Sequence, residues 1–129
     1  MENNIKIEFG HICENIIIAT SGNLSVINIF NQINATTFPA VHPILFILVG
    51  ASGEEGEYEL SLEIKNRKTG ESILKKPIPN KIKIPKPPNQ GRLAIRLSPL
   101  EIPSAAIYDV VISIGGSKKE LFFEAKMNA

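Results

Sequence analysis

The chain has 129 residues, of which 43% are hydrophobic and 21% are charged, and its formal net charge at pH 7 is +1. This length suits one domain spanning residues 1–129, and the apolar content is sufficient for a core, so intrinsic disorder is excluded for most of the chain. The near-neutral balance excludes a strongly basic nucleic-acid binder. The single Cys excludes an internal disulfide framework and any multi-Cys zinc module.

The sequence also bears on localisation. Spanning a bilayer takes roughly 18 apolar residues, whereas the longest apolar run, residues 44–51, has eight and includes a Gly. The first residues, Met-Glu-Asn-Asn, lack the basic start and the apolar segment of a signal peptide. We therefore expect a cytoplasmic protein that does not enter a membrane.

The composition predicts β structure. There are 21 Ile residues, a type that is stiff at its first side-chain torsion and packs well on a pleated surface. Nine Gly and nine Pro are scattered along the chain and leave no uninterrupted window with helical periodicity. The pattern is typical of an all-β protein.

Alternating or continuous apolar runs predict about eight or nine short strands. The phase of the alternation slips at Gly10, which indicates a bulge or a sharp bend there. Residues 38–43 carry two prolines and are expected to form an extended crossover, and Gly115-Gly116 predicts a tight closing hairpin. In chain order, the segments with strand patterns are 5–18 (interrupted at Gly10), 24–30, 44–49, 57–65, 72–78, 81–84, 92–98, 108–114 and 119–126.

This spacing predicts an antiparallel β-sandwich. The final unit, a Pro-containing approach, Tyr108, an alternating strand, Gly-Gly and a return strand, is similar to the closing hairpin of immunoglobulin-like domains. We expect segments 72–78 and 81–84 to be edge strands. The predicted core consists of Ile7, Phe9, Ile16, Ile18, Phe30, Phe46, Leu48, Leu60, Leu62, Leu93, Ile95, Tyr108, Val110 and Ile112.

One stretch resembles a known family. Gly22-x-Leu24-Ser25 leads to Phe30 and Ile33, and Phe38-Pro39-Ala40-Val41-His42-Pro43 follows, with Cys13-Glu14 upstream. The pattern is similar to that of a family of small bacterial proteins known only as a domain of unknown function. Asn28 stands where Gly is usual in that pattern, and Asn31 where an acid is usual. The resemblance brings no activity with it.

The charge distribution is uneven. Residues 54–63 hold five Glu and no base, whereas residues 65–86 hold eight basic residues and one Glu, a local net charge of +7. Such a segment attracts polyanions or an acidic partner, but it lacks aromatic residues that would stack on bases. Lysines on an edge strand also keep that edge soluble. The residues assigned to partner binding are Lys75, Lys76, Lys81, Lys83 and Lys86.

His11, Cys13 and His42 are the residue types from which a metal site or a thiol nucleophile is built. The alternative is a buried thiol beside two structural histidines, which is the usual role of a lone Cys. Nothing else in the chain has the spacing of a catalytic motif. We therefore expect no cofactor, no metal and no enzymatic activity.

These observations predict a non-catalytic protein-interaction or structural module, and a second copy of the chain is its simplest partner. Two alternatives stay open. The first is nucleic-acid or polyanion binding through residues 65–86, and the second is a thiol or metal hydrolase that uses Cys13 and His42.

Overall fold

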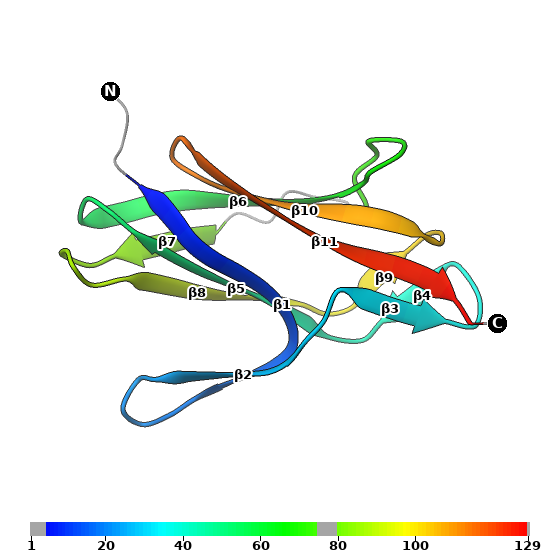
Figure 1. Ribbon diagram of the computed structural model, residues 1–129, viewed down its shortest axis with the longest axis horizontal. Helices are drawn as coiled ribbons and strands as arrows, with labels where there is room; N and C mark the ends of the chain where they lie inside the picture. Colours follow the sequence, from blue (N-terminus) through cyan, green and yellow to red (C-terminus); the bar gives the residue numbers. More distant parts are fainter. Residues whose placement is uncertain (1–4, 75–79, 129) are drawn as a thin grey trace.

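The computed structural model describes residues 5–74 and 80–128, and these residues form strands and turns without a helix. Two layers of strands lie one above the other in Figure 1. The strands are β1 (Lys6–Ile18), β2 (Leu24–Ile29), β3 (Gln32–Ala35), β4 (Ala40–His42), β5 (Leu45–Ser52), β6 (Gly56–Asn66), β7 (Asn80–Ile84), β8 (Gly91–Leu97), β9 (Leu100–Ile102), β10 (Ala106–Ile114) and β11 (Ser117–Met127). The prediction of an all-β fold is confirmed.

The strands form two main sheets. One has four strands in the order β2-β1-β5-β8, and the other has five in the order β3-β11-β10-β6-β7. The short strands β4 and β9 form a separate pair. Among the strand pairs of the described residues, β3 and β11 are the one parallel pair; the others are antiparallel. The antiparallel prediction needs this correction because residues 32–35 run beside the last strand instead of forming a hairpin.

Strand number and edges differ in part from the expectation. The predicted segments correspond to the strands β1, β2, β5, β6, β7, β8, β10 and β11. The strands β3, β4 and β9 were not predicted, because they are too short to show an alternation. Segment 81–84 is an edge strand, as predicted. Of segment 72–78, residues 75–78 lie outside the described part, and Ser72 makes a single bridge to Lys65.

One hydrophobic core lies between the two main sheets. It takes Ile47 and Val49 from β5, Leu60 and Ile64 from β6, and Ile112 from β10, all of them buried. β6 shows the expected two-faced alternation, because every second side chain along most of the strand points to solvent. β5 is buried along nearly its whole length, since it lies between β1 and β8.

The predicted core is largely confirmed. The buried members are Ile7, Leu48, Leu60, Leu62, Ile95, Tyr108, Val110 and Ile112, and the half-buried members are Phe9, Ile16, Phe30, Phe46 and Leu93. The assignment of Ile18 is wrong, because this side chain is 68% exposed. The alternation was correct, but the strand leaves the sandwich before it reaches Ile18.

The phase slip near Gly10 is a β-bulge. β1 pairs with β5 through Ile7↔Ala51 and then Phe9↔Gly50, so Glu8 is the additional residue. Buried side chains therefore change parity between Ile7 and Ile12. The predicted bulge is confirmed, two residues before Gly10.

The two layers come close where β7 of one sheet passes β8 of the other. Gly91, the first residue of β8, is buried, and a Cβ placed on it would meet the carbonyl oxygen of Lys83. Only glycine fits this approach of two backbones. In the described part of the chain, no helix is long and apolar enough to cross a membrane.

Candidate functional site

A β-hairpin extends from the four-stranded sheet, and we call residues 15–29 the arm. β1 pairs with β5 from Lys6 to Cys13, and beyond that point it pairs with β2. In Figure 1 the arm lies below the two layers, and its loop points away from them. At this loop Gly22, with φ of 91°, lets a three-residue turn close, and its N–H donates to the Ala19 carbonyl over 2.9 Å.

The arm exposes large apolar side chains. Ile17, Ile18 and Ile29 are 51%, 68% and 60% exposed. Residues 15–53 contain no Asp, Glu, Lys or Arg, so the whole arm is free of formal charge. A protruding surface that is apolar and uncharged is typical of a contact site for another macromolecule.

The root of the arm is held by Asn28. Its φ is 53°, a left-handed conformation that residues other than Gly, Asn and Asp rarely adopt. Its side-chain amide donates to the Glu14 carboxylate over 3.0 Å. Among residues with a side chain, Asn is one of those that this backbone conformation tolerates best.

The inner face of the arm borders a cleft of about 280 Å³ against the outer face of the four-stranded sheet. Leu24 and Val26 of β2 line one side, which places Ile17 and Ile27 on the opposite, outer face of the arm. The remaining lining residues come from β1, β5 and the start of β8: Phe9, His11, Leu48, Gln90 and Arg92.

The predicted basic segment does not stay separate from the acidic one. β7 pairs with β6 so that Lys81 lies opposite Glu59 and Lys83 opposite Glu57, and Lys81 Nζ is 3.6 Å from a Glu57 carboxylate oxygen. Antiparallel pairing therefore places the two signs of charge side by side at this edge of the sheet. Lys86 is exposed beyond β7, and Lys75 and Lys76 lie outside the described residues.

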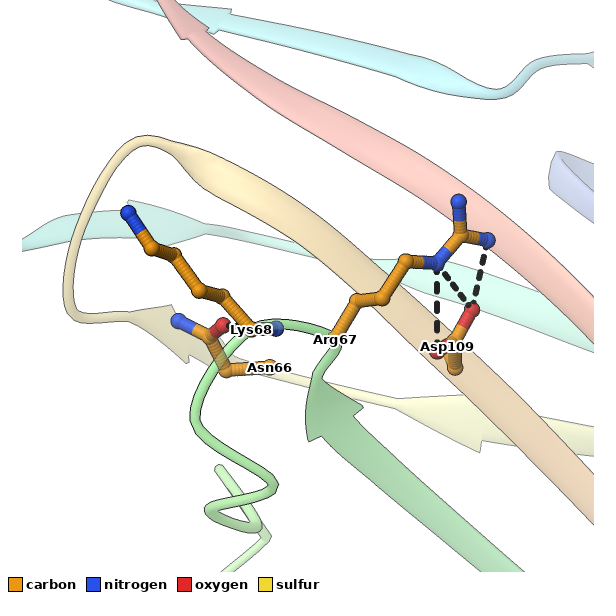
Figure 2. A network of polar contacts seen from close by, with 4 residues as sticks. All are labelled: Asn66, Arg67, Lys68 and Asp109. Carbon is orange, nitrogen blue, oxygen red and sulfur yellow. Dashed lines mark hydrogen bonds and ion pairs between the residues drawn. The ribbon is translucent and has the colours of Figure 1, made fainter.

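Arg67 of the same basic segment pairs with Asp109 of β10 (Figure 2). Its Nη2 is 2.7 Å and its Nε 3.0 Å from the Oδ1 of Asp109, and the guanidinium lies over the Phe122 ring. Hydrogen bonding to Asp109 raises the pKa of Arg67. Asn66 orders the same turn by accepting hydrogen bonds from the backbone N–H groups of Lys68 and Thr69. This network fastens a turn to the sheet.

His11 and His42 pack against different aromatic rings. The His11 ring stacks on Phe9 with 5.5 Å between centroids, and the His42 ring lies 5.8 Å from that of Phe30. Cys13 is fully buried, its thiol lies 3.8 Å from the Phe46 carbonyl oxygen, and burial raises its pKa. Across residues 5–74 and 80–128, no three His, Cys, Asp or Glu side chains form a group that could hold a metal ion.

The arm was not predicted as a site from the sequence. Its two strands and its turn were predicted, but Ile16 and Ile18 were assigned to the core. The available signal was the absence of charge from residue 15 to residue 53, which half-buried strands of the same chain do not share. Segment 57–65, for example, carries a charged residue at almost every outward position.

The fold and the arm together define a small all-β protein with one projecting hairpin. The chain belongs to a family of unknown function, DUF6941, whose model matches residues 8–122. The predicted membership in a domain of unknown function is thereby confirmed. No curated protein matches the chain.

Proposed function

We propose that this protein is a non-catalytic interaction module of the bacterial cytoplasm that acts by contact with another protein through the arm. The observation that carries the proposal is the projecting hairpin, which exposes three Ile side chains and has no charge. An apolar surface of this kind loses its unfavourable contact with water when a partner covers it. The basic lysines are a weaker candidate, because Glu57 and Glu59 lie opposite Lys83 and Lys81.

The surroundings of Cys13 support a non-catalytic role. A nucleophilic thiol needs a lowered pKa and access to substrate, whereas burial excludes solvent from Cys13 and raises its pKa. A buried, unpaired thiol is also suited to the reducing cytoplasm.

We further propose that the sandwich is immunoglobulin-like. The sheet β1-β5-β8 and the sheet β11-β10-β6 match the A-B-E and G-F-C arrangements of such domains, and β3 lies beside the last strand. The Tyr108 hydroxyl donates to the Ser104 carbonyl over 2.8 Å, as the tyrosine at the start of strand F does in these domains. This likeness concerns architecture and carries no activity.

The test is crosslinking in cells followed by affinity capture of three variants. We expect the wild type and Val41→Glu to retain the same protein, which the double variant Ile17→Glu/Ile29→Glu loses. Val41 is the matched control because it is an exposed apolar residue of β4, outside the arm. Retention of the same proteins by all three variants, or of none by the wild type, would contradict the proposal.

A further inference from the structure

The outer edge of β2 has the chemistry of a strand-pairing site. The Ala19 N–H donates to the Asn23 carbonyl over 2.8 Å, which fixes the alternation of the hairpin ladder. Counting back from that pair, the backbone groups of Ser25 and Ile27 face β1, and those of Leu24 and Val26 face outward. β2 is the last strand of its sheet, so these outward groups form an open edge.

This edge lacks the protection that two other edge strands, β7 and β8, have. β7 carries Lys81 and Lys83 and is followed by Pro85, and β8 carries Arg92 and Arg96 on exposed positions. Charged side chains and prolines at such places prevent pairing with another chain. β2 has neither, and the strand that backs it is charge-free from residue 15 onward.

We propose that the open edge of β2 pairs antiparallel with β2 of a second copy of this chain, about a two-fold axis. The inference rests on the proposed function and names its partner. A two-fold axis brings each strand against its own copy, and like charges opposite one another destabilise a strand pair. The charge-free arm meets this condition, whereas β7 paired with itself would place lysines against lysines.

The apolar side chains support the same partner. Ile17 and Ile27 share the outer face of the arm, so pairing at β2 extends one apolar surface across both copies. A partner recognised by charge would find nothing complementary on the arm. A second copy offers an identical uncharged edge and identical Ile side chains.

The test is sedimentation equilibrium of the purified full chain at micromolar concentrations, at low and at high salt. We expect a dimer whose dissociation constant is nearly independent of salt, because screening acts on charges. Ser25→Glu places a carboxylate on each of the two paired strands, and we expect it to raise the dissociation constant by about tenfold or more. Ser61→Glu, a change at an exposed serine of β6, is the matched control and should dimerise as the wild type does.

The result that overturns the inference is a monomer at both salt concentrations, a dimer that dissociates at high salt, or equal dimerisation by Ser25→Glu and the wild type. Because Ser25 and Ser61 are both exposed, both variants should keep the wild-type circular dichroism spectrum. A monomeric wild type that still captures a different protein through the arm would overturn the second-copy partner and leave the interaction function standing. Failure of both experiments would overturn both.

Discussion

The arm and the β6–β7 edge are both antiparallel strand pairs at the margin of a sheet, but they expose opposite kinds of side chain to water. On β7, Lys81 and Lys83 alternate with buried Ile82 and Ile84, and glutamates of β6 lie opposite the lysines. On the arm, Ile17 and Ile18 are exposed in succession and no charge occurs. The β6–β7 pair therefore buries one face in the core and exposes its other face to solvent.

The difference separates residues that stabilise the fold from residues available for contact. Paired opposite charges on an exposed face keep an edge soluble while adding little to stability. Exposed isoleucines add nothing to the core of the chain that carries them. Changes in the body should therefore alter the free energy of unfolding, and changes on the outer arm should alter association.

The largest effect on the body is expected at Gly91. Gly91→Ala forces a Cβ against the Lys83 carbonyl, and we expect the free energy of unfolding to fall by about 3 kcal/mol. Urea denaturation measures it. Gly116→Ala is the control, since a Cβ there has open space and should change stability by less than about 0.5 kcal/mol. Equal stability of the two variants would show that β7 and β8 can move apart.

A smaller effect is expected at the root of the arm. Asn28→Val places a β-branched residue in a left-handed conformation and should cost about 1 kcal/mol. Asn28→Gly should be tolerated, because Gly adopts that conformation freely. The measurement is hydrogen exchange at the Ile27 amide, which should quicken in the Val variant while the amides of β6 keep their protection. Equally slow exchange in both variants would mean that Asn28 does not hold the arm.

The smallest effect is expected at the charged edge. Lys81→Gln removes an exposed ion pair with Glu57 and should lower the free energy of unfolding by less than about 0.5 kcal/mol. Chemical denaturation at low salt is the appropriate measurement, because screening weakens such a pair further. If Lys81→Gln lowered the free energy of unfolding as much as Gly91→Ala does, the charged edge would have to be counted among the elements that stabilise the fold.

Local patterns predicted most of the fold. Alternation located β6 and β10, continuous apolar character located β5, and Gly115-Gly116 located the closing hairpin. These signals succeed because each depends on residues near one another in sequence. β3 could not be predicted, since four residues show no period and their partner β11 lies at the far end of the chain.

The candidate site was less predictable for a related reason. Alternation states which side chains share a face of a strand, but it does not state what covers that face. Ile16 and Ile18 do share a face, and the bend of β1 beyond Cys13 decides that the first is half-buried and the second exposed. Beyond Cys13, β1 pairs with β2 alone instead of with β5, and no single window of sequence contains all of these partner strands.

The parallel pairing of β3 with β11 makes the molecule mechanically resistant to tension along one direction. The arm leads into the start of β3, and the chain continues beyond the end of β11. The two strands are joined by hydrogen bonds that include Glu124 N–H to the Asn31 carbonyl and Asn128 N–H to the Ala35 carbonyl, each 2.8 Å long. Tension between the arm and the carboxyl end therefore loads these bonds in shear, all at once. A chain gripped by its arm would transmit force through its last strand without peeling it from the sheet.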